Sequence, residues 1–578
     1  MSDHQNSGRE QGMEKYFFRA SAADFKKIPG SPIAYWISPS TRKAFADGTP
    51  FRDIGYPRVG MQTSNNAKYL RFWFEVSSRG FFDSDKKCPR WIKYIKGGGF
   101  RRWYGNLEYI LHYKFSASYL LEQKNATVLP LEFLDKPKGT WTDLTSGKFN
   151  ARIAPVDSFH DISGHCFYPS AADLNWLLAY ANSKPFESFI SMINSSFHFQ
   201  VGDVGKMPIL AFDRREASHN VGKLLEISKG NWDSYETSWD FISLPLLHPD
   251  HRQPMLQASY QKLRAHWREL TQEMQRLEEE NNRIFIDAYG LQGELTPEVP
   301  LKEITLTCNP HYRYGGDKSE EELETMLLAD TMRELVSYAV GCMFGRYSLD
   351  KPGLILANQG ETLADYLAQV PQPSFPADDD NVIPLLDGDW FPDDITLRFR
   401  QFLRVAFGDA HYEDNLAFIE QALNVKGKRN YSLRDYFLGE FYAEHVKRFK
   451  KRPIYWLFSS PKGTFSALVY LHRYRPDTVS VVLSYLRDFR KKLASRLDYL
   501  QQVAINPSAS QSEKTKASKE ADTIKKQLFE LDDYERDTLY PLATEQVELD
   551  LDDGVKVNYL KLGAALKKIV GLDAKGED

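Results

Sequence analysis

Residues 256–284 read LQASYQKLRAHWRELTQEMQRLEEENNRI, and this stretch separates two parts of the chain that differ in character. Its large apolar side chains recur at alternating intervals of four and three residues, at Leu256, Tyr260, Leu263, Trp267, Leu270, Met274 and Leu277, with Asn281 and Ile284 continuing the series. Such spacing forms one stripe along a long α-helix, in which an Asn typically sets the packing register. About three to four heptads are marginally stable alone, so the stripe is expected to pack on a helix of the same chain. The pattern predicts a spacer helix within residues 251–300.

The residues before this helix have a mixed pattern. Short β-rich runs at residues 69–76 and 109–115 alternate with Gly and Pro turns, and one helix is expected at residues 171–194, interrupted at Pro185. Residues 1–15 are polar, which is typical of a disordered tail. We therefore expect one α+β domain over residues 16–250.

The residues after the spacer helix are mainly helical. A strand-like EITLTC at residues 303–308 precedes an amphipathic helix at 319–346 and an acidic, Pro-rich link, which together indicate a mixed, mainly helical domain over residues 301–480. Two helical patterns joined by NPSASQ predict an antiparallel helical hairpin within residues 481–578, and the chain ends in a pattern of turn, short strand and basic helix. The expected fold class is α+β: a mixed α/β domain, a long heptad helix and a mainly helical C-terminal region with a hairpin.

Composition limits the classes of protein to consider. The length of 578 residues is enough for three or four domains, and 42% of the residues are hydrophobic. The net charge of −4 is close to neutral for a chain of this length. No apolar run could span a bilayer and no signal-peptide core follows Met1, so we expect a soluble, cytoplasmic protein without a membrane partner. The four cysteines lie far apart without a CxxC pair, which fits a reducing compartment: Cys88, Cys166, Cys308 and Cys342.

Two basic, aromatic runs indicate nucleic-acid binding. Residues 86–104, KKCPRWIKYIKGGGFRRWY, hold seven Lys and Arg and no acid, interleaved with five aromatic residues and three glycines. Cations attract a phosphate backbone, rings stack on bases, and glycines let the main chain approach closely. A second run, KRFKKRPIYW at residues 447–456, repeats the composition. The alternative interpretations are a solvated loop and a solvated helix end.

Motifs for catalysis are weak. Residues 309–312, NPHY, resemble the Asn-Pro-Pro-Tyr of amino-methyltransferases, but His replaces the second Pro and no glycine-rich cofactor loop is recognisable, so we expect a structural turn. His160 and His165 beside Cys166 lack a second cluster that would complete a metal site. The acidic residues between 378 and 394 lack EF-hand spacing and are expected to form a solvated loop. We expect no catalytic, cofactor-binding or metal-binding residue in this chain.

A family resemblance extends over nearly everything after the polar tail. KKIPGSPIAYW, GMQTSNNAKYLRFWFEV, KGGGFRRWYGN, TWTDLTSGKFNARIAP, FHFQVGDVGKMPI, TCNPHYRYG, VSYAVGCMFGRYSLDKPG and RPIYWLFSSPKGTFSALVYLHRY occur in order from residue 26 to residue 474. The chain resembles the C-terminal half of the PglX family, adenine-specific DNA methyltransferases of type 1 BREX phage-defence systems. GMQTSNN and FQVGDVGKMPI also look like the start and end of target-recognition domains in type I restriction specificity subunits.

The resemblance implies a function and its partners. The catalytic lobe of that family, with its S-adenosylmethionine site, is expected to be missing here, because the chain is a fragment or because a split gene encodes the lobe separately. The partners implied are double-stranded DNA, that lobe, in cis or as a separate chain, and other BREX proteins. The expected DNA-binding residues are Gln62, Thr63, Asn65, Asn66, Lys93, Lys96, Arg101, Arg102, Trp103, Tyr104, Lys148, Arg152, Gln200 and Lys206.

Those residues have different expected roles. The cations would grip phosphates, the amides would reach base edges, and Trp103 with Tyr104 would stack beside an extruded base. A competing hypothesis is a protein-interaction module of a defence complex, with DNA binding secondary. A nuclease is a third and weaker idea, because no carboxylate–lysine cluster supports it.

Overall fold

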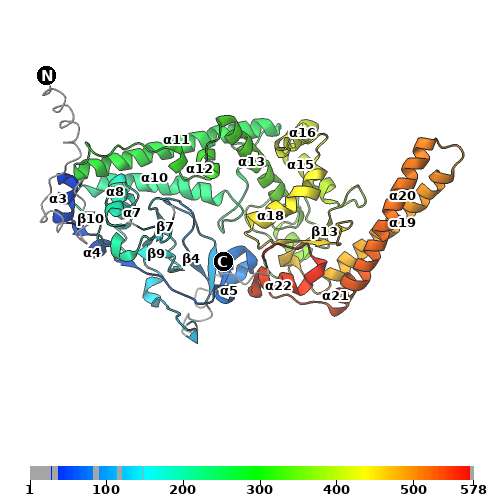
Figure 1. The fold of residues 1–578 in the computed structure, drawn as a ribbon, viewed down its shortest axis with the longest axis horizontal. Coiled ribbons are helices and arrows are strands. Elements are labelled where there is room, and N and C mark those ends of the chain that lie inside the picture. Colours follow the sequence, from blue (N-terminus) through cyan, green and yellow to red (C-terminus); the bar gives the residue numbers. More distant parts are fainter. Residues whose placement is uncertain are drawn as a thin grey trace, which may run out of the picture.

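The computed structural model describes residue 28 and residues 37–82, 90–113, 120, 122–145, 147–194 and 196–572. The tail 1–15 and Cys88 lie outside the described residues. Figure 1 shows an elongated molecule in which small sheets and helices lie at one end and a helical hairpin projects at the other. The predicted α+β class is confirmed. Among the described helices, none joins enough length to enough apolar character to cross a bilayer.

Two four-stranded sheets form the centre of the N-terminal part. The first has the order β2-β9-β6-β7 and is antiparallel throughout: β2 (Pro57–Arg58), β9 (Gly164–Phe167), β6 (Lys138–Thr142) and β7 (Ala151–Ala154). The second has the order β3-β5-β4-β8: β3 (Leu70–Phe72), β5 (Tyr109–His112), β4 (Trp91–Ile95) and β8 (Ser158–His160). Its β4–β8 pair is parallel, with Lys93 opposite Ser158. A two-stranded ribbon pairs β1 (Thr49–Pro50) with β10 (Pro208–Ile209).

The strands are shorter than the β-rich runs predicted. The run at residues 69–76 is strand only as β3, after which Trp73–Glu75 forms a 3-10 turn. The buried carboxylate of Glu75 accepts the backbone N–H of Phe72 at 2.9 Å and that of Val555 at 2.8 Å. The strand therefore ends where a side chain replaces the neighbouring strand as the backbone's hydrogen-bond partner.

Helices cover these sheets. They are α3 (Pro39–Asp47), α4 (Arg52–Gly55), α5 (Asn66–Tyr69), α6 (Ser78–Phe82), α7 (Leu174–Ala181), α8 (Lys184–Ile193), α9 (Val201–Val204) and α10 (Arg214–Asp233). The helix expected at residues 171–194 is two helices, and the predicted break at Pro185 is confirmed. Pro185 lies in the first turn of α8, where it needs no donor, and the Ser183 side chain caps that turn by accepting Phe186 N–H.

The predicted spacer helix is α11, Leu256–Tyr289. Most of its stripe is buried, and only Leu270 and Ile284 are half-buried. The helix packs on α8 and α10 on one part of its surface and on α16 (Tyr412–Leu423) of the C-terminal region on another. Asn281 donates to the carbonyl of Ala179 at 3.0 Å, so the Asn in the stripe fixes α11 against α7. Gly290, at φ +65°, ends the helix.

The C-terminal region contains the remaining helices around one small sheet. The helices are α12 (Pro310–Tyr314), α13 (Glu320–Met343), α14 (Leu363–Gln369), α15 (Ile395–Phe407), α17 (Leu433–Tyr436), α18 (Tyr442–Arg448), α19 (Thr478–Ile505), α20 (Gln511–Tyr534), α21 (Tyr540–Glu545) and α22 (Gly554–Leu562). The sheet has the order β11-β13-β12: β11 (Val382–Pro384), β13 (Ser466–Tyr470) and β12 (Tyr455–Ser459). The predicted hairpin is confirmed as α19 and α20, which lie side by side along their length in Figure 1.

Three local predictions were wrong. EITLTC is not a strand, because its backbone bonds to side chains: Asn309 Nδ2 donates to the carbonyl of Ile304 at 2.9 Å, and Asn231 Oδ1 accepts Thr307 N–H. The strand expected near the C-terminus is α22, whose first turn is held by Glu75. The acidic loop is not fully solvated, since Asp378 and Asp394 are buried.

Two large hydrophobic clusters hold the molecule together. The first contains residues from Ala44 to Tyr470, so the N-terminal sheets, α11 and the helices that follow share one core. The second joins the sheet β11-β13-β12 to the hairpin, along most of its length, and to α22. The α11 stripe belongs entirely to the first cluster.

The buried stripe leads to a stability prediction. Leu263→Ala should lower the free energy of unfolding by about 2–5 kcal/mol, because it leaves a cavity in the first cluster. The control is Glu269→Ala on the exposed side of α11, which should change it by less than about 0.5 kcal/mol. Urea unfolding of both variants measures the difference. Equal, small effects would contradict a packed stripe.

A second prediction concerns the buried carboxylate of Asp378. Burial, and then the nearby Asp380, raise the pKa of Asp378 to about 7. The folded chain therefore holds this proton more tightly than the unfolded chain, and this contribution to stability is lost as pH rises through about 7. Compared with Asp378→Asn, the wild type should lose about 1–3 kcal/mol between pH 5 and pH 8. The exposed neighbour, in Asp379→Asn, should leave the pH dependence unchanged, and urea unfolding at both pH values tests the pair.

Candidate nucleic-acid interface

The sheet topology brings several loops to one end of the N-terminal part. Because β4 and β8 are parallel, Lys96 and Asp161, which follow them, lie at the same end. Thr142 at the end of β6 lies opposite Gly164 at the start of β9, which adds residues 143–145 and 147–148. The backbone N–H of Asp143 donates to the carbonyl of Ser163 at 3.0 Å. We call this set of loops, residues 61–62, 96–100, 143–145, 147–148, 161–164 and 196–200, the loop end.

Residues 196–200 join the loop end through main-chain bonds. Leu144 and His198 form an antiparallel bridge, and Phe199 N–H donates to the carbonyl of Asp143 at 2.8 Å. The buried indole of Trp141 donates to the carbonyl of Phe199 at 2.7 Å. On this fixed backbone Leu144 and Phe197 are 59% and 67% exposed. The loop end thus presents apolar as well as polar side chains to solvent.

The glycine run permits this close meeting of loops. A Cβ at Gly97 would lie 2.7 Å from the carbonyl oxygen of Ser163, and Gly98 has a φ of +133°. Thr142 Oγ1 donates to the carbonyl of Gly98 at 3.3 Å. The structure therefore explains Gly97 and Gly98 by packing between loops, whereas a Cβ at Gly99 would meet no atom within 4 Å.

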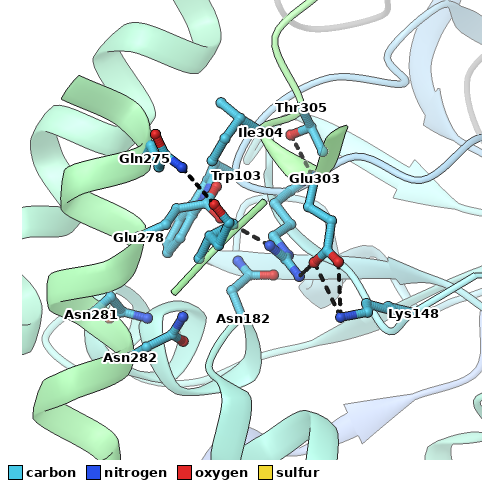
Figure 2. A network of polar contacts seen from close by, with 12 residues as sticks. Trp103, Lys148, Asn182, Gln275, Glu278, Asn281, Asn282, Glu303, Ile304 and Thr305 are labelled. Carbon is cyan, nitrogen blue, oxygen red and sulfur yellow. Dashed lines mark hydrogen bonds and ion pairs between the residues drawn. The ribbon is translucent and has the colours of Figure 1, made fainter. Parts of the chain in front are cut away.

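The residues after the glycines turn into the interior. Figure 2 shows Glu278 of α11 among these groups: its Oε1 accepts Trp103 Nε1–H at 2.8 Å and its Oε2 accepts Arg102 Nη1–H at 2.9 Å. Arg102 is 5% exposed and Glu278 is 3% exposed. Burial would lower the pKa of Arg102, but the combined attraction of Glu278, Glu187 and Glu303 raises it. Arg102 is therefore charged and paired inside the protein.

Arg101 and Arg152 are also buried, without carboxylate partners among their described contacts. Arg101 donates to the carbonyl of Thr305 at 3.2 Å and to Thr307 Oγ1 at 2.8 Å. Arg152 donates to the carbonyl of Arg101 and to Asn150, and burial lowers its pKa to about 10. In this structure both guanidinium groups are committed to the chain itself, and so is the ring of Tyr104, which lies under Lys229.

The predicted lysines have partners in reach. Lys148 pairs with Glu187 at 3.0 Å and with Glu303 at 3.1 Å, the latter seen in Figure 2. Lys93 pairs with Asp157 at 3.0 Å, and Lys206 pairs with Asp203 at 2.9 Å next to the β1–β10 ribbon. Lys96 lies over the ring of Tyr109 at 5.2 Å. Of these four, Lys96 and Lys148 belong to the loop end.

The predicted amides divide between two places. Gln62 and Gln200 lie at the loop end, with Gln200 exposed and Gln62 held to Thr127 through main-chain bonds. Thr63 donates to Asn66 Oδ1 at 2.6 Å, and Asn65 caps α5 by accepting Lys68 N–H at 3.1 Å. These three lead into β3, whose first residue pairs with Leu111 at the end of the sheet opposite Lys96. The structure therefore does not bring all predicted residues together.

The motif NPHY is the structural turn expected. Asn309 is buried and caps α12, its Oδ1 accepting His311 N–H at 3.2 Å. Its Nδ2 donates to the carbonyls of Leu301 and Ile304. Tyr312 donates its hydroxyl to the carbonyl of Phe100. The amide of Asn309 thus has its hydrogen-bonding capacity occupied within the turn.

The second basic run meets the segment that follows the first. Lys450 pairs with Glu108, which follows the first run in sequence and precedes β5. Arg452 is buried and Arg448 pairs with Glu236 at 3.5 Å, whereas Lys447 is exposed. Segments more than 300 residues apart therefore lie together at the junction of the two parts.

Glu278 is a residue that the sequence pattern did not single out. It lies beside the stripe, next to Leu277, in a run of three glutamates whose other members are more exposed. Nothing local distinguishes it, because its partners Arg102 and Trp103 are 176 and 175 residues away. Only the tertiary structure identifies the pair.

Comparison with known proteins gives a class for this arrangement: over almost its whole length the chain is similar to adenine-specific methyltransferases. Adenine-specific methyltransferase BrxX of Escherichia coli O9:H4 (strain HS) is 36% identical over 566 residues, which is 95% of this chain and 46% of that protein. Adenine-specific methyltransferase PglX of Lacticaseibacillus casei (strain Zhang) is 32% identical over 580 residues, 96% of this chain and 46% of that protein. No protein-family model matches. The chain spans about half the length of these relatives, and the expected resemblance to PglX is confirmed at that level.

The buried ion pair of Arg102 and Glu278 leads to a prediction for the free energy of unfolding. Glu278→Gln should destabilise the protein by about 3–5 kcal/mol, because it leaves the buried charge of Arg102 without its closest counter-charge. Glu273→Gln on the same helix removes only a solvent-exposed ion pair with Arg276 and should cost less than about 1 kcal/mol. Urea unfolding of the two variants separates the cases. A small effect at Glu278 would mean that Arg102 finds another partner.

Proposed function

We propose that this chain is the target-recognition half of a PglX-like adenine-specific DNA methyltransferase of a BREX system. The similarity to BrxX and PglX over 95% of the chain carries the proposal. In it, the chain corresponds to the C-terminal half of such a protein, acts in the cytoplasm and directs methylation of the adenine amine for host marking and phage defence. The catalytic lobe with S-adenosylmethionine is supplied in cis or by a separate chain, and this chain alone is inactive.

The loop end is the surface proposed to meet double-stranded DNA. It gathers loops from two rigid sheets, which is a common way to position binding residues. Gln62 and Gln200 are the amides proposed to read base edges there, and Lys96 and Lys148 the cations proposed to position phosphates. Arg101, Arg102 and Arg152 are given a supporting role, because their guanidinium groups are buried against the chain. Leu144 and Phe197 add apolar contacts that could enter a groove.

The second candidate function is a protein-interaction module, and the hairpin favours it. The α19–α20 hairpin projects from the body in Figure 1 and exposes Tyr499, Ile505 and Phe529. Large exposed apolar side chains on a projecting element are typical of protein contacts. Other BREX proteins, or the catalytic lobe, are the partners that this role would serve. DNA binding would then be secondary.

Duplex binding at several salt concentrations tests the proposed function. Lys96→Ala should weaken binding to all duplexes alike and reduce the slope of affinity against salt by about one unit, since phosphate contacts carry no sequence information. Gln200→Ala should instead narrow the difference between target and non-target duplexes at an unchanged slope. Lys516→Ala, exposed on the hairpin, is the matched control and should change neither.

Two outcomes would count against this assignment. Unaltered duplex affinity in both loop-end variants would remove the loop end as the DNA surface. A hairpin variant that weakens binding as much as Lys96→Ala would move the surface to the C-terminal region.

A further inference from the structure

A cavity of about 490 Å³ lies at the junction of the two parts of the molecule. Trp232 at the end of α10 and the two residues Tyr235 and Glu236 line it from the N-terminal part. Helices α12 and α13 line it from the C-terminal region, and Lys447 and Arg448 of α18 complete it. Its volume is in the range of ordinary small-ligand pockets.

Buried polar groups without hydrogen-bond partners line this cavity. Glu236 is 3% exposed, and neither of its carboxylate oxygens has a hydrogen bond of standard geometry, although the otherwise unpartnered hydroxyl of Ser337 lies nearby. Its one ion pair, with Arg448, is long at 3.5 Å. The hydroxyl of Tyr235 and Nη1 of Arg313 are likewise buried and unpartnered. Buried polar groups are almost always hydrogen-bonded, so unpartnered groups around one cavity favour a polar occupant there.

The other charges of the cavity are already neutralised. Arg313 pairs with Asp330 at 3.0 Å and with Glu334 at 2.9 Å, and Arg333 pairs with Glu444 at 2.7 Å. Lys447 is exposed at the rim and makes no ion pair among the described residues. What the cavity offers is therefore one carboxylate with only a long ion pair, two unpartnered donors and a cationic rim.

The aromatic residues favour a planar ligand. Trp232, Tyr235 and Tyr314 all line the cavity. Cations already lie near two of their rings: Arg101 is 4.9 Å from the ring centre of Trp232 and Arg313 is 5.7 Å from that of Tyr235. Planar heteroaromatic rings gain stacking energy on such side chains.

We propose that this cavity binds a guanine base. Guanine carries two adjacent N–H donors, on its ring nitrogen and its amino group, which match the two free acceptors of the Glu236 carboxylate. Its O6 and N7 acceptors match the unpartnered donors of Arg313 and Tyr235, since guanidinium groups characteristically bind that edge. The rim cations Lys447 and Arg448 suit a phosphate attached to the base. The inference does not depend on the DNA-binding proposal, since a free guanine nucleotide and a guanine of a nucleic acid offer the same edge.

Isothermal titration calorimetry of the full chain tests the cavity with four probes: guanosine monophosphate, guanosine, adenosine monophosphate and inorganic phosphate. Guanosine and guanosine monophosphate should bind, and adenosine monophosphate should bind at least about tenfold more weakly, because adenine places an acceptor where Glu236 needs a donor. Equal binding of both monophosphates, or no binding of guanosine, would overturn the proposal and leave water as the occupant.

Variants then assign the binding to this cavity. Glu236→Gln should weaken guanosine monophosphate at least about tenfold, since an amide supplies only one acceptor. Glu226→Gln on α10, whose side chain is 70% exposed, is the matched control and should bind as the wild type does. If Glu236→Gln unfolds at a markedly lower temperature than the wild type, Tyr235→Phe gives a second readout. It should weaken the binding of guanosine monophosphate severalfold. Unchanged affinity in folded variants at both positions would place the site elsewhere and overturn the proposal.

A competition experiment identifies the source of the base. A fluorescent single-stranded oligonucleotide with one guanine is compared with its guanine-to-adenine counterpart on the full chain. If the base comes from nucleic acid, guanosine monophosphate displaces the guanine oligonucleotide and Glu236→Gln removes the preference for it. If the ligand is a free nucleotide, both oligonucleotides bind alike and guanosine monophosphate displaces neither.

Discussion

The carboxylate of Glu278 connects the parts of this molecule. It accepts Arg102 and Trp103 from the N-terminal part while belonging to the helix that packs on the C-terminal region. A buried ion pair adds little net stability over a hydrophobic contact, but either partner left alone is costly. The pair therefore specifies one relative position of the sheets and α11. The loop end depends on that position because its loops are part of the sheets. The junction cavity depends on it because residues of both parts line the cavity.

The sequence patterns that extend over a whole helix or turn predicted the structure well. The apolar stripe of α11, the break at Pro185 and the α19–α20 hairpin each follow from local spacing or turn chemistry. The misassigned segment at residues 303–308 alternates apolar and polar residues as a strand does. Its backbone, however, forms hydrogen bonds with side chains such as that of Asn309 instead of with a neighbouring strand. Local patterns report which side of a segment is buried, and they do not report what its backbone bonds to.

The candidate site shows the same limit at the level of single residues. The composition of residues 86–104 suits nucleic-acid binding, yet Arg102 and Trp103 are internal and Lys96 remains nearer the surface. A basic run without acids looks solvated because its counter-charges lie elsewhere in sequence, here on α11 and at Glu303. The sequence also did not indicate that the side chain of Phe197 is exposed, because a large aromatic side chain is usually buried. Burial and pairing across long sequence distances are what the structure adds.

The shared hydrophobic core limits which segments of this chain can be exchanged with those of its relatives. Residues that face the N-terminal sheets come from α11 and from the segment around residues 301–309, beyond the end of the mixed α/β part. A chimaera that replaced only residues 37–250 would pair a foreign Arg102 equivalent with the resident Glu278 and a foreign sheet surface with the resident α11. The natural unit of exchange is therefore larger than the mixed part, because its contacts continue past Asn309 to Tyr312 and, through Glu75, to Val555.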